Sequence, residues 1–327
     1  AGLGSQGIED CLAICDMVAA ELNITRDAVL PFSTGVIGER LPLERFSTHL
    51  GECIATLCQD NWVAASRSIL TTDTVSKAAS RTIELNGGER VVISGIAKGS
   101  GMIEPNMATM LAFLATDAKV DPAYLQTVLE SAVDESFNCI TVDGDTSTND
   151  ACMLIATAES GIEISEHSDS RVKELFTDSV REVATQLAQA IVRDGEGASK
   201  FITIRVTGGR SQSDCRMIAK TVANSPLVKT ALHASDPNWG RIYAAIGRAP
   251  VEDLHLDRVN ININDVVVMS AGKLNPDYRE ADAAAAMIDA ELSIGIDLGI
   301  DQSGESATVW TTDFSYEYIR INAEYRT

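Results

Sequence analysis

The sequence of 327 residues has no long hydrophobic run and few basic side chains. No apolar stretch approaches the roughly 20 residues that a membrane-spanning helix needs, so we expect no membrane partner. Only 26 lysines and arginines accompany 47 aspartates and glutamates, which gives a net charge of −21 at pH 7. A chain this acidic lacks the general positive field that attracts nucleic acid, so we expect no nucleic-acid partner either. At 45% hydrophobic and 22% charged residues, its composition is that of a folded globular protein of about two domains.

Cysteine and histidine are too sparse and too scattered to indicate a metal site. The seven cysteines contain no C-x-x-C pair, and Cys11 and Cys15 lie one helical turn apart in an apolar pattern that is typical of buried thiols. The four histidines show no zinc-ligand spacing, so we expect neither a metal nor a disulfide. Free thiols indicate a reducing compartment: the cytoplasm or, in a eukaryote, an organellar matrix. The sequence begins at Ala1 rather than at a methionine, so any targeting segment would precede it.

Helical and strand patterns alternate along the whole chain. Apolar side chains at three- and four-residue spacing predict helices, whereas β-rich runs bounded by turn residues predict strands. The Asn86-Gly87-Gly88 turn predicts a hairpin, and Asp121-Pro122 predicts the start of a helix. We expect helices over 8–22, 43–57, 122–135, 172–191 and 281–290, and strands over 82–85, 91–96, 107–116, 152–157 and 201–206. A hairpin is expected over 259–269, and further strands from Leu292 and over 307–321. This alternation predicts a layered α/β (α+β) fold with a boundary near Gly208.

The glycine-rich stretch from Gly95 to Gly101 invites comparison with phosphate-binding loops. Lys98 precedes Gly99, whereas a P-loop needs Gly-Lys-Ser/Thr at the start of a helix. The order of the glycines also differs from the dinucleotide-binding fingerprint. A loop at the end of a strand, with a positive φ, is the simpler interpretation, and a separate role for Lys98 stays open.

Two acidic segments have both a structural and a functional interpretation. The segment 143–150 resembles a calcium loop, but Thr148 and Leu154 stand where an EF-hand needs glycine and glutamate, so a capped polar turn fits better. Glu196 lies between two glycines after a predicted helix, where it is either a solvated carboxylate or a functional one. The sequence has no G-x-S-x-G motif and no histidine in a typical catalytic loop, so a serine–histidine mechanism lacks support.

Thr109 follows the glycine-rich stretch in the sequence PNMATML (105–111). This threonine belongs to a set of segments that follow one another along the chain in a specific order. In these segments the sequence resembles the ornithine acetyltransferases, also called glutamate N-acetyltransferases. The matching segments are PFSTGVIGE (31–39), TTDT (71–74), GIAKGSGMIEPNMATMLAF (95–113), TVDGDTSTND (141–150), AQAIVRDGEGASKFI (188–202), SPLVKTAL (225–232), DPNWGRI (236–242) and INAEYRT (321–327). Family members carry a further N-terminal region, so the resemblance predicts a chain that is truncated or processed before Ala1.

The resemblance implies a self-cleaving enzyme. The precursor would be cut between Ala108 and Thr109 into an α and a β chain, and the new N-terminal Thr109 would be the nucleophile. Its free α-amine, with a reference pKa of about 7.7–8.0, is suited to act as the base. The Thr34 hydroxyl and the Gly35 backbone N–H would form the oxyanion hole. The implied substrate-binding residues are Thr72, Lys98, Thr109, Glu196, Asn322 and Thr327.

The implied reaction is a ping-pong transfer of acetyl from N2-acetylornithine to glutamate in arginine biosynthesis. By charge, Lys98 suits a substrate carboxylate, and Glu196 suits a substrate ammonium or the proton of the leaving amine. No metal or organic cofactor is implied, and acetyl-CoA stays open as a second acetyl donor. The implied architecture has a larger catalytic domain over 1–207, a smaller α/β domain over 208–300 and C-terminal strands over 301–327 that return to the active site. The α and β chains are expected to dimerise further into a heterotetramer.

Two other functions use the same residues differently. An N-terminal-nucleophile amidohydrolase or aminopeptidase would also use Thr109, but water would then take the acyl group instead of glutamate. A catalytically silent amino-acid-binding protein would keep an intact chain and bind its ligand without turnover. Cleavage at Thr109 and the dependence of product release on glutamate distinguish the acetyltransferase, the hydrolase and the binding protein.

Overall fold

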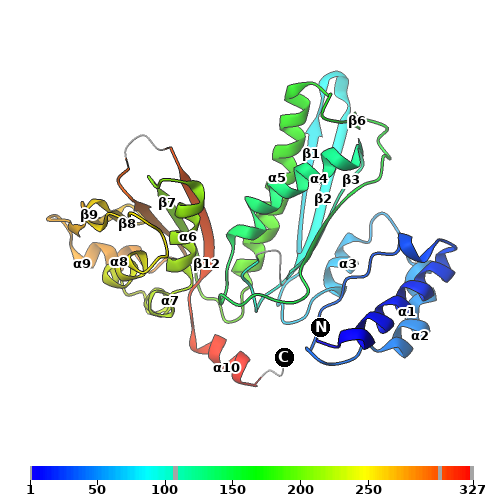
Figure 1. Cartoon of the computed structure of the whole chain (residues 1–327), viewed down its shortest axis with the longest axis horizontal. Coiled ribbons are helices and arrows are strands. Elements are labelled where there is room, and N and C mark those ends of the chain that lie inside the picture. The colour runs from blue at the N-terminus through cyan, green and yellow to red at the C-terminus, as the bar shows by residue number, and fades with distance from the viewer. Residues whose placement is uncertain (1, 106–109, 301–303, 325–327) are drawn as a thin grey trace.

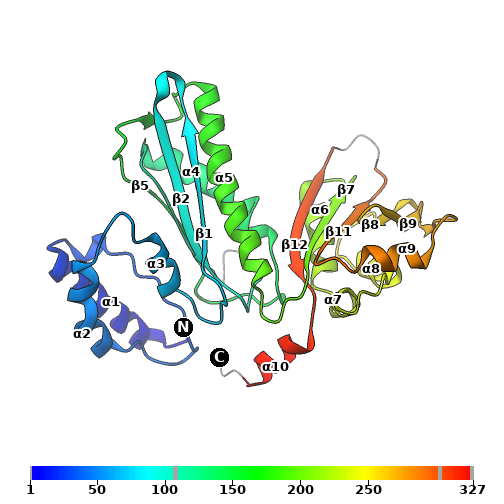
Figure 2. The same cartoon turned by 180° about the vertical axis from the view of Figure 1, so that it is seen from behind.

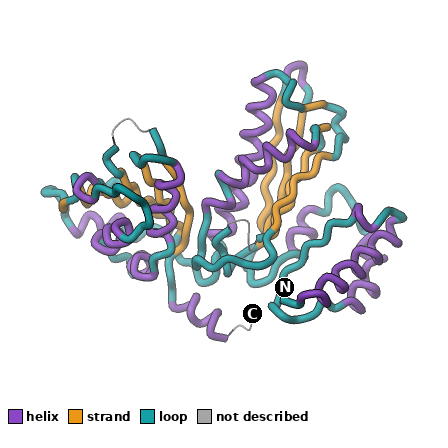
Figure 3. Tube along the Cα trace, in the orientation of Figure 1, coloured by secondary structure: helices purple, strands orange, loops and turns teal. Residues whose placement is uncertain are grey.

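The structure is a computed structural model that describes residues 2–105, 110–300 and 304–324. A first sheet has four neighbouring strands in the order β1 (Lys77–Glu84), β2 (Arg90–Lys98), β3 (Leu111–Thr116) and β5 (Ala151–Ala156). A second sheet has the order β10 (Lys273–Leu274), β9 (Val266–Ser270), β8 (Asn260–Ile263), β11 (Glu291–Asp297), β7 (Phe201–Thr207) and β12 (Ser306–Thr312). The short strands β4 (Lys119–Val120) and β6 (Glu163–Ile164) form a parallel pair. In Figure 3 the strands gather into two separate groups.

Helices surround both sheets, so the predicted layered α/β (α+β) fold class is confirmed. The helices are α1 (Gly4–Leu22), α2 (Leu43–Ala55), α3 (Trp62–Ser68), α4 (Pro122–Asp134), α5 (Ser170–Arg193), α6 (Gln212–Ala223), α7 (Pro226–His233), α8 (Trp239–Gly247), α9 (Glu280–Ala286) and α10 (Tyr316–Glu324). Short 3-10 turns accompany them: η1 (Arg26–Ala28), η2 (Asn86–Gly88), η3 (Phe137–Cys139) and η4 (Leu256–Arg258). No helix within the described residues combines the length and the apolar character that crossing a bilayer requires.

The first sheet is built on the predicted hairpin. β1 and β2 pair in antiparallel register from Lys77↔Ala97 to Glu84↔Arg90, and Gly87 and Gly88 turn the chain between them with φ angles of +87° and +83°. β3 pairs antiparallel with β2 and parallel with β5. The hairpin prediction is confirmed. Strand β3 covers residues 111–116 of the strand expected over 107–116, and residues 106–109 lie outside the described residues.

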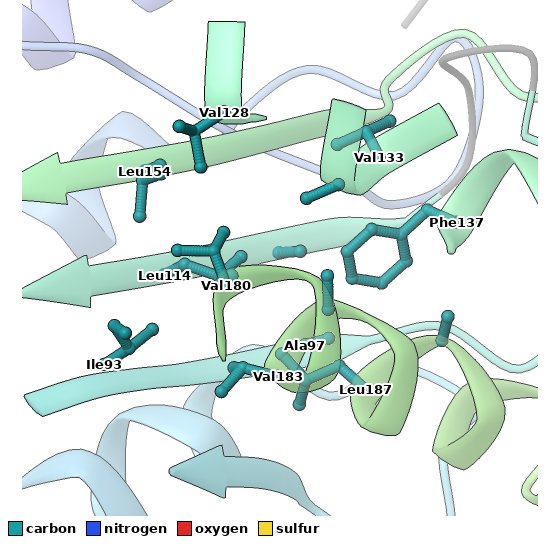
Figure 4. Packing of buried hydrophobic residues seen from close by; sticks show 14 of the residues in the cluster. Ile93, Ala97, Leu114, Val128, Val133, Phe137, Leu154, Val180, Val183 and Leu187 are labelled. Atoms are coloured by element: carbon teal, nitrogen blue, oxygen red, sulfur yellow. The ribbon is translucent and has the colours of Figure 1, made fainter. Parts of the chain in front are cut away.

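Helices α4 and α5 cover one face of this sheet. Figure 4 shows Ile93, Ala97 and Leu114 of the strands facing Val183 and Leu187 of α5, and all five are at most 1% exposed. Helix α4 begins as predicted, because the Asp121 carboxylate accepts hydrogen bonds from two backbone N–H groups of the first turn. The buried apolar face explains why the long amphipathic helix predicted over 172–191 forms.

The second sheet has its own core and its own helices. β11 lies between β8 and β7, parallel to β7 and antiparallel to β8, and β12 pairs antiparallel with β7 on the far side. Helix α6 packs against β7 and β12. The division into 1–207, 208–300 and 301–327 stays a prediction. In this sheet β7, which ends at Thr207, pairs with strands on the other side of that division.

The C-terminal segment is not the run of strands expected over 307–321. β12 ends at Thr312, and the helix α10 follows, so the expectation is wrong beyond Thr312. Figures 1 and 2 both show α10 below the junction of the two sheets. The short helix α3 was also missed by the sequence analysis.

Side-chain contacts explain why α10 is helical. The Ser315 hydroxyl accepts the backbone N–H groups of Glu317 (3.1 Å) and Tyr318 (3.2 Å), as a helix cap does. Arg320 forms ion pairs with Glu317 at i−3 and with Glu324 at i+4. Capping and paired charges at helical spacing stabilise the helix, although aromatic and β-branched residues in this segment favour strands.

Candidate active site

A pocket of about 220 Å³ lies where β2 meets the glycine-rich loop. Six residues that the sequence predicted for the site line this pocket: Thr34, Gly35, Thr72, Lys98, Glu196 and Asn322. They come from five segments spread over nearly 290 positions of the chain, and the fold brings them together. The cleavage pair Ala108 and Thr109, and the C-terminal Thr327, lie outside the described residues.

The segment 31–36 forms the N-terminal wall of the pocket. Phe32 packs edge-on against Phe113 of β3, with ring centroids 5.4 Å apart. The Asn149 amide donates a hydrogen bond to the Ser33 carbonyl at 3.0 Å. Among the residues that the structure describes, no atom beyond the chain neighbours lies within 4 Å of the place where Gly35 would carry a Cβ, so these residues leave a ligand free approach to its backbone. These contacts hold the segment against the sheet at a place where its polar groups face the pocket.

A buried ion-pair network supports the opposite wall. The Lys77 ammonium lies 2.6 Å from a carboxylate oxygen of Asp73 and 2.6 Å from one of Asp194, and Lys77 is 2% exposed. Asp194 also accepts the backbone N–H of Thr74 at 3.0 Å. One lysine therefore joins the loop before β1 to the C-terminal end of α5.

The same network fixes two residues of the pocket. The Asp73 carboxylate accepts the backbone N–H of Gly99 at 2.7 Å. Burial by itself would raise the pKa of Asp73, but the hydrogen bonds from Gly99 and Lys77 outweigh burial and hold this pKa below its usual value. Thr72 precedes Asp73 and Lys98 precedes Gly99, so both pocket residues are held by their neighbours. Gly99 has a φ of +152° at the end of β2, which confirms the loop predicted there.

Lys98 is buried without a direct partner. It is 4% exposed, and among the described residues its ammonium has no hydrogen bond or ion pair. Burial lowers its pKa, which the charges of Asp73, Asp150 and Glu196 partly offset. An ammonium that lines a pocket and lacks a partner is suited to bind a carboxylate of a ligand.

Glu196 is also buried, at 8% exposure, so the alternative of a solvated carboxylate is wrong. Its backbone N–H donates to the Ser100 carbonyl at 2.8 Å, and its Oε2 accepts the Asn322 amide at 2.9 Å. A Cβ on Gly101 would lie 2.4 Å from the Glu196 carboxylate, so a larger residue there would displace this carboxylate from its present position. A carboxylate and an ammonium thus share one pocket, an arrangement that suits a zwitterionic ligand.

The polar turn after Thr141 joins three walls of the pocket. The two carboxylate oxygens of Asp143 accept the backbone N–H groups of Met102 (2.7 Å) and Ile103 (2.9 Å), and one also accepts the Tyr318 hydroxyl at 3.3 Å. This confirms the predicted turn whose side chains satisfy backbone groups. The described residues contain no cluster of acidic, histidine or cysteine side chains that could hold a metal ion.

The sequence analysis missed Asp143 and Tyr318 as pocket residues. Burial, together with the negative charge of Asp143, raises the pKa of Tyr318, which therefore stays protonated and donates. The local signal for Asp143 was the acidic turn itself. No local sequence pattern indicated Tyr318, because its place in the pocket depends on the unexpected helix α10.

A second cavity of about 450 Å³ adjoins the pocket. It shares Thr34, Gly35 and Asn149 with the pocket, and it lies between the start of α1 and the segment 33–42. The Arg40 guanidinium pairs with the buried Asp10 carboxylate at 2.6 Å and joins these two elements. A ligand larger than the first pocket can therefore extend past Thr34 and Gly35.

Comparisons with known proteins confirm the family that the ordered segments indicated. A family model described as the ArgJ family matches residues 1–327. The Arginine biosynthesis bifunctional protein ArgJ of Methylococcus capsulatus is 53% identical over 327 residues, covering 100% of this chain and 79% of that protein. The protein of the same name from Pseudomonas syringae pv. tomato is 47% identical, covering 100% and 80%.

A solved structure agrees with this assignment. The crystal structure of Arginine biosynthesis bifunctional protein argJ from Bacillus halodurans has a TM-score of 0.62 and 36% sequence identity, covering 66% of this chain and 100% of that chain. The family model and the two relatives each match all 327 residues. The chain therefore belongs to the ArgJ family and is an acyltransferase.

Proposed function

We propose that this protein is a glutamate N-acetyltransferase of arginine biosynthesis, which transfers acetyl from N2-acetylornithine to glutamate. The observation that carries the proposal is the pocket that collects Thr34, Gly35, Thr72, Lys98, Glu196 and Asn322. Each substrate is an amino acid or an acylated amino acid, and the pocket offers one ammonium and one carboxylate to such molecules. Membership of a family whose relatives are named for arginine biosynthesis supports the same conclusion.

In this proposal the two buried charges select and orient the substrates. Lys98 binds the α-carboxylate of acetylornithine and later that of glutamate. Glu196, held in place by the Asn322 amide, binds the side-chain ammonium of ornithine or takes part in proton transfer at the leaving amine. Thr72 lines the same pocket beside the Asp73 anchor and contributes its hydroxyl.

The proposed chemistry runs through Thr109 after self-cleavage between Ala108 and Thr109. The Thr109 hydroxyl attacks the acetyl carbonyl while its proton passes to the free α-amine. The C–N bond of acetylornithine then breaks, the proton passes to the leaving amine, and acetyl-threonine remains. Glutamate attacks this ester in the reverse sense. Thr34 and Gly35 donate to the oxyanion of both tetrahedral intermediates, and no metal or organic cofactor takes part.

A second acetyl donor, acetyl-CoA, is part of the proposal. The adjoining cavity of about 450 Å³ offers a larger acetyl donor room beyond Thr34 and Gly35. The names of both relatives call those proteins bifunctional, which supports two acetyl donors here. We further propose that the α and β chains stay associated, dimerise into a heterotetramer, and work in the cytoplasm.

Mass spectrometry of the purified precursor tests the central step. We expect two fragments that meet at Ala108 and Thr109, and an uncut, inactive protein for Thr109→Ala. Thr109→Ser is the matched control, because it keeps a hydroxyl and should still be cut. A cut and active Thr109→Ala protein would remove Thr109 from the mechanism.

Ornithine release with and without glutamate separates the transferase from the amidohydrolase. Steady release should need glutamate, since only glutamate empties the acetyl-enzyme in the proposed reaction. Equal release in both samples would instead identify a hydrolase. Binding without any turnover, in an intact chain, would identify the silent amino-acid-binding protein.

A further inference from the structure

The pocket carries more negative than positive charge. Among the described residues, its lining contains one ammonium, that of Lys98, and three carboxylates, those of Asp143, Asp145 and Glu196. An acylated amino acid whose α-carboxylate pairs with the ammonium leaves these carboxylates without a cation, unless its side chain carries one. The charge of the pocket therefore favours an acetyl donor with a cationic side chain.

Two of these carboxylates already have partners in the protein. The oxygens of Asp143 accept two backbone N–H groups at 2.7 and 2.9 Å, and one also accepts the Tyr318 hydroxyl. Glu196 accepts the Asn322 amide at 2.9 Å and is 8% exposed. Asp145 differs, because it is exposed in the lining and its carboxylate has no hydrogen bond or ion pair among the described residues. Asp145 is thus the carboxylate that can bind a cationic ligand without giving up another contact.

The positive and negative walls of the pocket lie on different elements. Burial raises the pKa of Tyr318, and the negative charges of Asp143, Glu196 and Asp145 raise it further, so these carboxylates lie around the tyrosine. The ammonium belongs to Lys98 at the end of β2, whereas Asp145 belongs to the polar turn after Val142. A substrate with one charge of each sign can therefore lie across the pocket from β2 to this turn.

We propose that Asp145 is a specificity-determining residue that binds the side-chain ammonium of acetylornithine while Lys98 binds its α-carboxylate. This assignment rests on the proposed function, because it concerns the acetyl donor of that reaction. Glu196 then keeps the second of its two proposed roles, proton transfer at the leaving amine. No bond forms or breaks at Asp145, which acts only through its charge.

The same charge acts in opposite directions on the two substrates. The Asp145 carboxylate attracts the side-chain ammonium of acetylornithine, but it repels the side-chain carboxylate of glutamate, which enters the pocket in the second half of the reaction. In a ping-pong reaction, kcat/KM for each substrate depends on its own half-reaction. A purely structural change affects both halves alike, whereas the loss of this charge changes their ratio.

Steady-state kinetics of Asp145→Asn test this assignment. The ratio of kcat/KM for acetylornithine to kcat/KM for glutamate should fall by about tenfold, the contribution typical of one hydrogen bond between charged groups. N-acetylnorleucine, in which a methyl group replaces the ammonium, tests the same contact from the side of the ligand. Wild type should use it about tenfold less well than acetylornithine, and Asp145→Asn should discriminate less between the two donors.

The matched control is Asp265→Asn. Asp265 is also exposed, but it lies in the turn between β8 and β9, outside the pocket lining. The substitution makes the same chemical change and should leave the ratio and the choice of donor as in wild type.

Each outcome supports or overturns the assignment. Wild-type protein that transfers no acetyl from acetylornithine to glutamate would refute the proposed function and this inference together. Active wild type with an unchanged ratio for Asp145→Asn, whether both values stay the same or fall together, would refute this inference alone. Wild type that uses N-acetylnorleucine as well as acetylornithine would overturn it too. An Asp145→Asn protein that does not fold would show that this carboxylate has a structural partner, which also contradicts the assignment.

Discussion

Replacing Lys77 by methionine should destabilise the protein strongly. The substitution keeps the length of the side chain but leaves the carboxylates of Asp73 and Asp194 buried without their shared cation. Both carboxylates are at most 5% exposed in these ion pairs. Breaking a buried ion pair from one side costs about 3–5 kcal/mol. At roughly 2–4 °C per kcal/mol for a domain of this size, the thermal midpoint of Lys77→Met should fall by roughly 6–20 °C.

The matched control is Lys119→Met. Lys119 pairs with Glu163 at 2.9 Å, close to the distances at Lys77, but its side chain is 61% exposed and that of Glu163 is 64% exposed. An exposed pair contributes about 0–1 kcal/mol, so this variant should unfold within a few degrees of wild type. Differential scanning fluorimetry at pH 7 compares the three proteins. Equal midpoints for the two variants would refute the argument that burial gives the Lys77 network its strength.

Acid should weaken the same network. The pKa of Asp73 in the folded protein is below its usual value of 3.8. A carboxyl whose pKa is depressed on folding contributes stability above its unfolded pKa and loses it as the pH falls through the folded value. The difference between wild type and Lys77→Met should therefore shrink as the pH falls, because the wild type loses the contribution of Asp73 below about pH 4 and the variant is relieved at higher pH, when its unpaired Asp73 carboxyl takes up a proton. A difference that grew as the pH fell would assign the effect to another group.

Two substitutions in the pocket test separate parts of the site. Thr34→Val should lower kcat by about 10²–10³ with little change in KM, because the lost donor acts on the oxyanion rather than on the bound substrate. An unchanged kcat in steady-state assays would place the oxyanion hole elsewhere. Asn322→Asp should raise KM for acetylornithine, because the amide that donates to Glu196 at 2.9 Å becomes a second carboxylate beside it. Asn322→Ala is its control and should have the smaller effect; the opposite order would show that charge at this position is unimportant.

Much of the fold could be predicted from local sequence patterns. The hairpin at Asn86-Gly87-Gly88, the helix that begins after Asp121 and the long helix over 172–191 all form as predicted. In each case the pattern and the tertiary contact favour the same structure: positive φ at the turn, a capped first turn, or an apolar stripe against a sheet. The helix α10 was missed because its capping by Ser315 and its pairs with Arg320 outweigh the strand preference of its aromatic residues.

The candidate site could be predicted only in part from the sequence. The residue types around Lys98 and Glu196 indicated charge-based recognition, but nothing local to the sequence indicated that both side chains are buried in one pocket. Nothing in the sequence around Lys77 indicated its role, although Asp73 precedes it by four positions. Its importance comes from Asp194, which lies 117 positions away, and contacts over such distances depend on the whole fold.

The arrangement of the pocket has a consequence for biosynthesis. Thr34 and Gly35 leave the ribosome early, whereas Tyr318 and Asn322 emerge nearly 290 residues later. At about 5–20 residues per second, translation separates the two walls by roughly 15–60 seconds. During that interval the nascent chain carries the first sheet without the helix that completes its pocket. The pocket is therefore completed only at the end of synthesis, and an early stop codon before residue 318 yields a protein without the Tyr318 and Asn322 lining.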